Sequence, residues 1–358
     1  MRLLLLGAAS SIHLQRWANA FAQRGHETHL ITLHAPLGGY DERVRIHRLP
    51  YRGGAGYLTA RGAAARLAQR LGPDAINAHY ASGYGSLAPA LRGIPLVLNV
   101  WGSDVYEFPD KSPLHRALLR RNLLRADAVV STSRVMAERT MRTCPALREV
   151  AVVPFGVDTD RFSPAPEPDG PLTIGTVKAL APKYGIDTLI EAFALLARRE
   201  EWRSLRLRIA GDGPERARLE ALARGTGFAE RIEMVGAVPH GRVPDELRRL
   251  HVYAALSRAD SESFGVAVIE ASACGKPVVV SRAGGLPEVV DEGATGLVVP
   301  KDDPAAAARA LERLLRDGAL RAAMGAAGRA RVMQQYEWRR CVDLQLDAIR
   351  RAMEKAKR

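Results

Sequence analysis

The sequence is poor in cysteine and in aromatic residues, and it has no long apolar run. Its 358 residues include three cysteines, Cys144, Cys274 and Cys341, which lie far apart and show no metal-binding or disulfide spacing. This scarcity favours a reducing, cytoplasmic environment. No run of about eighteen apolar residues occurs, so we expect no membrane-spanning helix. Residues 3–6 precede a glycine turn and a polar helical segment, so we interpret them as a first strand and not as a signal peptide.

Negative charge is also in short supply. The 52 Lys and Arg residues outnumber the 39 Asp and Glu residues, which gives a net charge of +13. Residues 1–160 hold 20 of these basic residues against 12 acidic ones, so most of the excess lies in the first part of the chain. A basic surface favours an anionic partner, such as nucleic acid, an acidic membrane or a phosphorylated substrate, although an Arg-rich soluble surface would have the same composition. The sequence lacks zinc-finger spacing and an RNP-like aromatic strand, which argues against nucleic acid.

Short runs rich in Leu, Val and β-branched residues alternate with amphipathic helical stretches through most of the chain. In the first part the expected strands are residues 3–6, 28–32, 74–79, 95–100 and 128–131. Between the first two, apolar residues at positions 14, 17, 18, 21 and 22 form a helical stripe that Gly25 ends. This alternation predicts a parallel sheet covered by helices on both faces.

The rhythm is interrupted at residues 163–171, which contain four prolines and one glycine. We interpret this segment as a linker between an N-terminal domain, residues 1–162, and a C-terminal domain, residues 172–335. Expected strands in the second domain are residues 172–177, 205–210, 231–235, 252–256, 277–280 and 296–299. Residues 336–358 form a last helical stretch with no strand after it. Two doubly wound domains would place a ligand cleft between the carboxyl ends of their strands.

In the second domain, two carboxylates flank a Ser-Phe-Gly turn and an apolar run. We expect Glu262 to lie in a loop and Glu270 to lie in the helix that follows, with the Gly265 amide at the helix N-terminus, where phosphate binds readily. Carboxylates on both sides of a phosphate site suit a nucleotide-sugar. Lys178 and Lys183 follow the first strand of this domain and could stabilise the charge of a departing nucleotide. The alternative is that all four are solvated or capping residues.

In the first domain, the first strand leads into a turn that contains Ser10, Ser11 and His13. The turn can offer backbone amides to an anion, but it is not a dinucleotide fingerprint, and an ordinary turn with a serine N-cap is an equal alternative. His79 and Asp104 follow later strands. Polar residues at such positions point into the cleft of a doubly wound sheet, whereas Asp104 could also be only a helix cap.

Taken together, these strings resemble the retaining nucleotide-sugar glycosyltransferases of family 4, which have the GT-B fold. The strongest matching strings are residues 257–265, 270–271, 275–279, 284–288, 293 and 296–297, with support from residues 155–162, 178, 183–185 and 211–214. The resemblance implies two doubly wound Rossmann-like domains that face a central cleft, with a C-terminal helix that returns to the N-terminal domain. It also implies that the N-terminal domain binds the acceptor and the C-terminal domain binds the donor.

The resemblance assigns roles to individual residues of the second domain. Glu262 would hold hydroxyls of the donor sugar, Glu270 would accept hydrogen bonds from the ribose, and Lys183 would bind the diphosphate. Lys178 stands where the family usually has Arg, so the charge is kept while the bidentate fork is lost. The remaining donor-side residues are Phe264, Gly265 and Val266 at the helix N-terminus, Gly211 after the second strand, and Val235 and Val238 in the wall that packs against the base.

The first domain departs from the family pattern in two places. Trp101 precedes Gly102 where many relatives place a histidine that acts at the reacting centre, and His13 or His79 could replace it. Residues 9–11 read Ala-Ser-Ser where a Gly-Gly phosphate turn is common. The resemblance therefore says little about the acceptor.

The resemblance thus implies a glycosyltransferase that retains the anomeric configuration of its donor. We expect it to require neither a metal nor a cofactor, because no Asp-x-Asp signature occurs in a plausible place. No residue is marked as a carboxylate nucleophile, which favours a front-face route. We expect a UDP-sugar rather than a GDP-sugar as donor, and a glycan, glycolipid or other anionic acceptor in cell-surface polysaccharide or glycolipid synthesis. The alternatives are a nucleotide-sugar epimerase on the same fold and a non-catalytic sugar- or lipid-binding relative.

Residues 112–125 suggest contact with a membrane. On a helix, Leu114, Ala117, Leu118 and Leu124 would share one stripe, with arginines 116, 120 and 121 on its flanks. The ordinary expectation is that the stripe faces the core of its own domain. The alternative is a helix seated on anionic lipid, helped by arginines 43, 45, 48 and 52, in a peripheral enzyme at the inner membrane face.

Overall fold

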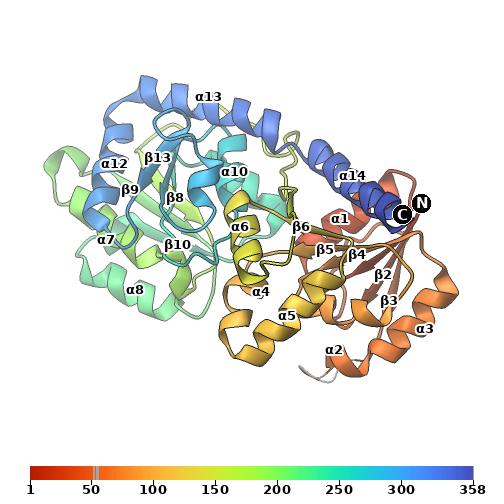
Figure 1. Cartoon of the computed structure of the whole chain (residues 1–358). Coiled ribbons are helices and arrows are strands. Elements are labelled where there is room, and N and C mark those ends of the chain that lie inside the picture. The colour runs from red at the N-terminus through yellow and green to blue at the C-terminus, as the bar shows by residue number, and fades with distance from the viewer. Residues whose placement is uncertain (51–52, 54–55, 358) are drawn as a thin grey trace. The chain divides into compact units, whose positions relative to one another are not determined.

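The structure is a computed structural model that describes residues 1–50, 53 and 56–357, so Arg52 lies outside the described residues (Figure 1). The chain divides into two compact units. The first comprises Met1–Phe155 and Arg340–Arg358, and the second comprises Gly156–Arg339. Each unit is built around a parallel sheet with helices, so the predicted α/β class with two doubly wound domains is confirmed.

The described part of the first unit contains seven parallel strands in the order β3-β2-β1-β4-β5-β6-β7. The strands are β1 Arg2–Leu6, β2 Glu27–Thr32, β3 Val44–Arg48, β4 Ala75–His79, β5 Leu96–Val100, β6 Ala128–Ser131 and β7 Ala151–Val152. The α-helices are α1 Ile12–Gln23, α2 Gly56–Thr59, α3 Arg61–Leu71, α4 Ser103–Tyr106, α5 Pro113–Arg125, α6 Arg134–Thr143 and α14 Trp338–Ala356. The strand order reverses between β1 and β4, which makes the carboxyl ends of these strands a switch point where ligands bind in such sheets.

Burial explains why the strands were predictable. The four leucines of β1 are completely buried, as a strand with helices on both faces requires. In α1, Leu14, Trp17 and Phe21 are buried as the apolar stripe predicted. The five expected strands are confirmed to within one residue at each end, whereas the edge strands β3 and β7 were not predicted.

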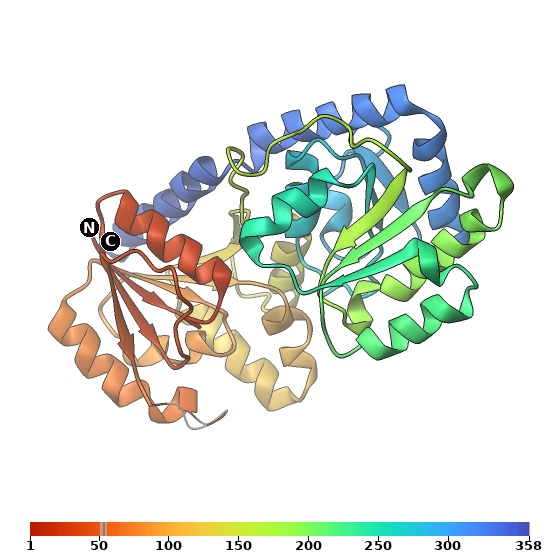
Figure 2. The same cartoon turned by 180° about the vertical axis from the view of Figure 1, so that it is seen from behind.

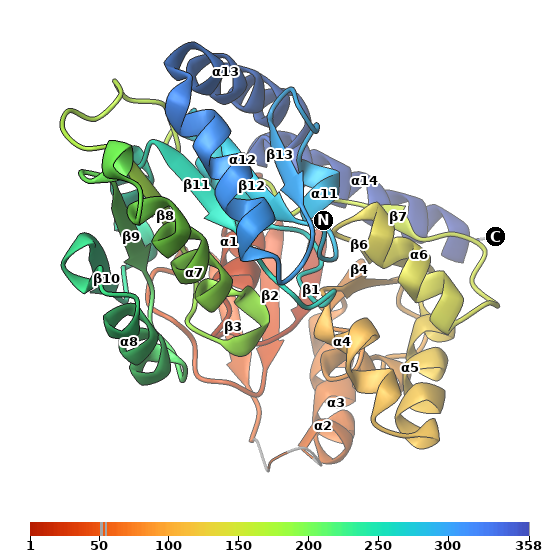
Figure 3. The ribbon, with the colours of Figure 1, turned by 90° about the vertical axis from the view of Figure 1, so that its left-hand side faces the viewer.

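The second unit has, among its described residues, six parallel strands in the order β10-β9-β8-β11-β12-β13. They are β8 Thr173–Val177, β9 Arg206–Ala210, β10 Ile232–Gly236, β11 Val252–Ala255, β12 Val278–Ser281 and β13 Gly296–Val299. The helices are α7 Ile186–Ala197, α8 Arg216–Gly225, α9 Val243–Arg248, α10 Val266–Ala273, α11 Leu286–Val289, α12 Pro304–Arg316 and α13 Gly318–Gln335. Helices α7 and α12 lie side by side over the sheet (Figure 3), and α10 packs against α13. The switch point of this sheet lies between β8 and β11.

The predicted domain boundary is wrong by several residues. The proline-rich segment has no helix or strand, but it lies on the second unit, and the chain divides already after Phe155. Side chains of the second unit hold the segment that precedes the prolines. Arg329 donates to the carbonyl oxygens of Thr159 and Phe162 at 3.0 and 2.6 Å, and Arg248 donates to the Ser163 carbonyl at 3.0 Å. These bonds fix the backbone of residues 159–163 to the second unit.

The C-terminal helix belongs to both units, and most of it lies on the first. Helix α14 begins at Trp338, and residues 340–358 belong to the first unit, as predicted for a helix that returns to the N-terminal domain. An ion pair between Arg24, next to the end of α1, and Asp343 joins α14 to that unit. Figure 2 shows the ribbons of α14, in dark blue, and of α1, in red. Inside the unit, Gln345 of α14 is buried and donates to Asn77 Oδ1 of β4 at 3.1 Å.

Helix α5 does not turn the expected stripe toward the core. Leu114 and Leu124 are 76% and 53% exposed, whereas Leu119 and Leu123 are buried. Asn122 is buried beside them and donates to the Ala81 carbonyl and to Ser86 Oγ, so the opposite side of the helix is the anchored one. The expectation that the Leu114–Leu124 stripe faces the core is therefore wrong. Separately, no helix within the described residues is long and apolar enough to cross a bilayer.

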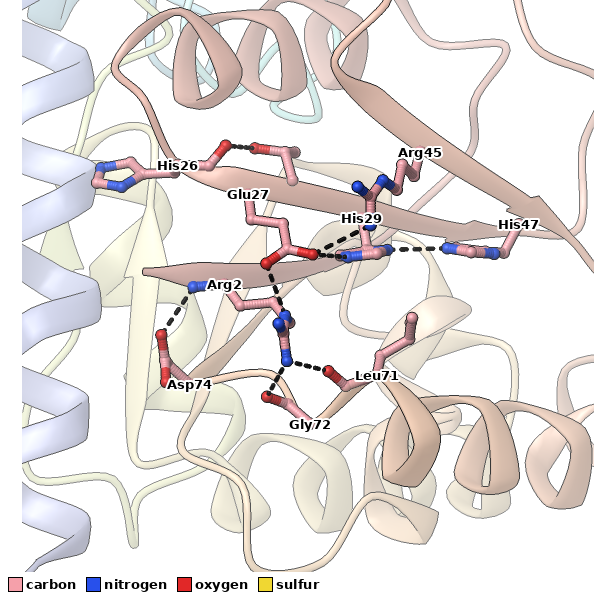
Figure 4. A network of polar contacts seen from close by, with 10 residues as sticks. Arg2, His26, Glu27, His29, Arg45, His47, Leu71, Gly72 and Asp74 are labelled. Carbon is pink, nitrogen blue, oxygen red and sulfur yellow. Dashed lines mark hydrogen bonds and ion pairs between the residues drawn. The ribbon is translucent and has the colours of Figure 1, made fainter.

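A chain of polar side chains joins β1, β2 and β3 near the amino ends of these strands (Figure 4). The Glu27 carboxylate accepts from Arg2 Nε at 2.8 Å and from Arg45 Nη1 at 3.1 Å. It also contacts His29 Nε2 at 3.1 Å, and His29 Nδ1 lies 3.0 Å from His47 Nε2. Because an ionised carboxylate only accepts hydrogen bonds, His29 carries its proton on Nε2 and accepts from His47 at Nδ1. The neutral pair thus has one defined arrangement of protons.

The histidine pair predicts a loss of stability in acid. Burial, then the nearby His29 and Arg45, lower the pKa of His47 below its ordinary value. The unfolded chain then binds the proton more readily, so this stabilisation is complete above the ordinary histidine pKa and is lost as the pH falls below it. His47→Gln keeps an N–H donor for His29 but does not titrate. We expect the melting temperature of wild type to fall relative to that of His47→Gln between pH 7 and pH 5. A difference that stays constant with pH would contradict the assignment.

Candidate functional site

The predicted donor-side residues gather in loops that follow the central strands of the second sheet. Lys178 and Lys183 follow β8, Gly211 follows β9, and Glu262 lies in the loop between β11 and α10. Because parallel strands end at the same edge of a sheet, these loops share the edge at the β8/β11 switch point. The fold therefore puts Lys178, Lys183 and Glu262 where doubly wound sheets bind ligands.

The centre of this site is an ion pair between Lys178 and Glu262. Lys178 Nζ lies 2.9 Å from Glu262 Oε1, and the two side chains are only 16% and 8% exposed. Burial alone would lower the pKa of Lys178, but the Glu262 carboxylate outweighs it and raises that pKa above its ordinary value. The lysine is therefore charged at any physiological pH. Burial also raises the pKa of the neighbouring Tyr253 to about 12, so its hydroxyl stays protonated.

Tyr184 brings the two lysines to one place. The ammonium groups of Lys178 and Lys183 lie 4.4 and 4.9 Å from the centroid of its ring. Ring faces attract cations, so Tyr184 stabilises both ammonium groups in this loop. Gly185, at φ +60°, allows the loop to approach the end of β11, because a Cβ there would lie 1.9 Å from the Leu256 carbonyl oxygen. Sequence reasoning missed the role of Tyr184, although its position between Lys183 and a glycine marks it.

Glycines also shape the loop that carries Glu262. A Cβ on Gly284 would lie 2.3 Å from the Glu262 carbonyl oxygen, and one on Gly285 would lie equally close to that of Ser263. The Gly285 amide donates to the Glu262 carbonyl at 2.9 Å. Gly265 follows with φ +97° and caps α10, whose first residue is Val266. The backbone of residues 284–285 thus packs directly against the Glu262 loop. Only glycine leaves room for this contact at both positions.

The remaining donor-side residues surround the same edge. Glu270 is in α10, as predicted, and is buried, with His240 Nε2 at 3.2 Å from its Oε1. Gly211 has φ +149° and comes so close to Lys178 that a Cβ would lie 1.8 Å from its carbonyl oxygen. Val235 lies near the end of β10 and Val238 is in the loop that follows, both half-buried, while Phe264 is buried. Sequence reasoning missed His240, whose only signal was its place in a loop after a strand.

In the first unit, Ser11 and Asp104 have structural partners. Ser11 Oγ accepts from the Leu14 amide and caps α1, while Ser10 is exposed. The Asp104 side chain is completely buried and accepts from the amides of Ala81 and Gly102, both at 2.8 Å. Burial raises the pKa of Asp104 although these amides oppose the shift. Asp104 is the second residue of α4, whose N-cap is Gly102 and has no side-chain cap bond, so the alternative that Asp104 is only a helix cap is not borne out. Its carboxylate instead holds the loops that follow β4 and β5.

His79 is held in one tautomer by buried amides. Asn99 Nδ2 donates to the Ala78 carbonyl at 2.9 Å and to Asn77 Oδ1 at 2.6 Å, which fixes the orientation of both amides. Asn77 Nδ2 then faces His79 Nε2 at 3.2 Å, so Nε2 accepts and the proton resides on Nδ1. Burial lowers the pKa of His79 to about 3. His79 is thus held as a neutral imidazole whose Nε2 atom accepts from the Asn77 amide.

Aromatic rings gather around His79 at the carboxyl end of β4. The Trp101 ring lies 4.9 Å from that of His79 and 5.4 Å from that of Phe155, and His13 stacks on Phe155 at 4.3 Å. The residues that could replace the missing histidine, His13 and His79, therefore lie with Trp101 in one cluster. Over the described residues, no group of three or more His, Cys, Asp or Glu side chains is arranged to hold a metal ion.

Comparison with known proteins agrees with this geometry. Residues 158–331 match the family described as "Glycosyl transferases group 1", and residues 2–133 match "Glycosyl transferase 4-like". A GDP-mannose-dependent alpha-(1-6)-phosphatidylinositol monomannoside mannosyltransferase of Mycolicibacterium smegmatis is 32% identical over 91% of each chain. A D-inositol 3-phosphate glycosyltransferase of Kineococcus radiotolerans is 35% identical over 58% of this chain and 52% of its own.

Solved structures show the same fold. Sucrose-phosphate synthase from Thermosynechococcus elongatus superposes with a TM-score of 0.87 at 22% identity, over 99% of this chain and 100% of that one. HepE of Anabaena, solved in complex with UDP, gives 0.83 at 19% identity, over 98% and 100%. The extent and identity of the sequence match, with two Rossmann-like units of this topology, show that the chain belongs to the family 4 glycosyltransferases and has the GT-B fold.

Proposed function

We propose that this chain transfers a hexosyl group from a GDP-sugar to a hydroxyl of a phosphoinositol-type glycolipid, with retention of anomeric configuration. Its family directly supports glycosyltransferase activity with a nucleotide-sugar donor. The observation that carries the proposal is the Lys178–Glu262 pair, with Lys183 beside it, at the β8/β11 switch point. The relatives named GDP-mannose-dependent favour GDP over the UDP expected from the sequence. Their names include a phosphatidylinositol monomannoside, which supports a glycolipid acceptor.

The charges of the site suit departure of a nucleoside diphosphate. As the bond between the anomeric carbon and the phosphate oxygen breaks, its electron pair stays on the diphosphate, and Lys178 and Lys183 stabilise that charge. The two ammonium groups supply the positive charge that a divalent ion would otherwise supply to the diphosphate, which supports metal independence. The acceptor oxygen bonds to the anomeric carbon on the same face and passes its proton to the leaving phosphate. Glu262, bound to Lys178, orients sugar hydroxyls and is not a nucleophile.

A donor assay tests the proposal. We expect GDP release from GDP-mannose that depends on a phosphatidylinositol or phosphatidylinositol-mannoside acceptor, exceeds that from UDP-sugars, and survives EDTA. The anomeric proton–carbon coupling of the product should match that of the α-linked donor. Transfer from no nucleotide-sugar would reject the function. Inversion would reject the retaining route, and loss of activity on chelation that magnesium or manganese restores would reject the lysine model.

Substitutions in the ion pair test the roles of its members. Glu262→Gln and Lys183→Ala should each reduce transfer by at least about 100-fold, or about 3 kcal/mol, because each removes a charge that orients or stabilises the reacting groups. Lys178→Arg keeps the charge and restores the residue usual in the family, so it serves as the matched control and should retain most activity. Melting temperatures should show that all three variants fold. Near-normal turnover in Glu262→Gln or Lys183→Ala would remove the assignment.

The exposed side of α5 supports an enzyme that works at an anionic membrane surface. Leu114 and Leu124 project into solvent on this helix, and Lys111, Arg116 and Arg121 beside them are exposed. Apolar side chains with basic neighbours favour insertion at the headgroup boundary, where each basic residue contributes about 1 kcal/mol. A glycolipid acceptor would be presented at such a surface. We therefore expect a peripheral enzyme on the cytoplasmic face of the membrane.

Liposome co-sedimentation tests this surface. Binding should increase with the fraction of anionic lipid and decrease with salt. Leu114→Gln with Leu124→Gln should weaken binding several-fold, since each removes an inserting side chain. Leu195→Gln alters an exposed leucine of the second unit and is the matched control, which should bind like wild type. Protein that stays in the supernatant with anionic vesicles at low salt would rule out the membrane surface.

A further inference from the structure

His240 makes a contact with Glu270 that the catalytic account above does not use. Its Nε2 atom lies 3.2 Å from Glu270 Oε1, and the two side chains are 33% and 8% exposed. Glu270 is held in α10, while His240 begins the short helical turn His240–Arg242 after β10. The contact therefore joins two separate elements of the second unit at the edge where the donor-side residues gather.

Residues 158–162, which precede the proline-rich segment, hold His240 in place. Phe162 is buried, and its ring lies 5.8 Å from that of His240, while Arg161 donates to the His240 carbonyl oxygen. Asp158 forms the turn behind them, because its Oδ1 atom accepts from the Arg161 amide at 3.2 Å and its carbonyl accepts from the Phe162 amide at 2.8 Å. Residues 158–162 thus contact both the ring and the main chain of His240 and fix their positions.

The chemistry of the contact defines what remains available on Glu270. An ionised carboxylate only accepts hydrogen bonds, so the proton lies on His240 Nε2 whether the ring is neutral or charged. Within the described residues, Oε2 of Glu270 has no hydrogen-bond partner, whereas Oε1 is held by His240. One oxygen therefore fixes the plane of the carboxylate, and the other is offered to a ligand hydroxyl. Because Oε1 keeps a second lone pair besides the one that accepts from His240, the two oxygens together can accept from both hydroxyls of a vicinal diol.

We propose that His240 is a positioning residue that orients Glu270 toward the ribose diol of the donor nucleotide, and so sets the preference for ribonucleotides over deoxyribonucleotides. This inference rests on the proposed function, because it takes the bound ligand to be a nucleoside diphosphate. A fixed carboxylate loses little conformational entropy when the diol binds, whereas a free one must be ordered at that moment. The effect of His240 is thus on selectivity for the sugar of the nucleotide and not on the chemical step.

Calorimetric titration of full-length protein with GDP and 2′,3′-dideoxy-GDP measures this selectivity. His240→Leu removes the donor but keeps an apolar contact for Phe162, and His240→Gln keeps an N–H near the position of Nε2. We expect His240→Leu to weaken GDP binding about tenfold while dideoxy-GDP binding changes little, so the ratio of the two affinities approaches one. His240→Gln should keep most of the wild-type ratio. Glu270→Gln, which removes the carboxylate, should lose selectivity as His240→Leu does.

The outcomes separate this inference from the function on which it rests. A purely structural role for His240 would weaken both nucleotides equally and leave their ratio unchanged, which would overturn the proposal. A ratio that falls in Glu270→Gln but not in His240→Leu would also overturn it and leave the proposed function intact. Wild-type protein that binds neither GDP nor UDP would overturn the proposed function, and the role of His240 with it.

Discussion

The buried ion pair between Lys178 and Glu262 is the interaction on which the donor side depends. Removing one partner of a buried pair leaves an uncompensated charge and costs about 3–5 kcal/mol, so each of the two residues stabilises the charge of the other. Because the pair follows β8 and β11, it sits where the strand order reverses, and every loop that reaches it comes from the same edge of the sheet. The ring of Tyr184 contacts the ammonium groups of both Lys178 and Lys183, so a second positive charge lies on the same ring as the first.

Close backbone approach makes this arrangement possible. Gly185, Gly211 and Gly284 each lie where a Cβ would overlap a neighbouring carbonyl oxygen, at 1.9, 1.8 and 2.3 Å. All three also have positive φ, which other residues adopt only with strain. These three glycines, which belong to the sequence motifs of the family, thus allow separate loops to pack closely around the charged side chains. The first unit uses buried amides instead, which hold His79 neutral next to the Trp101 ring.

The sequence predicted the strands closely because buried parallel strands are continuous apolar runs, and it predicted Glu270 in a helix because the apolar run follows a glycine. It missed β3, an edge strand whose Arg and His residues break the apolar pattern. It misplaced the domain boundary because prolines mark irregular backbone rather than a division between units. The stripe on α5 was assigned to the core because periodicity does not tell which face a domain covers, and Asn122 anchors the other one. His240 could not be predicted from the sequence because its role depends on a contact with Glu270, thirty residues further along the chain.

The central claim is that Lys178, Lys183 and Glu262 form the site of a nucleotide-sugar. A crystal structure with bound GDP-mannose, or with GDP and mannose, tests it most directly. The account predicts diphosphate oxygens within hydrogen-bond distance of both lysine Nζ atoms, sugar hydroxyls on Glu262, and the ribose diol on Glu270. A nucleotide bound away from the carboxyl ends of β8 and β11, with the Lys178–Glu262 pair untouched by it, would contradict the account.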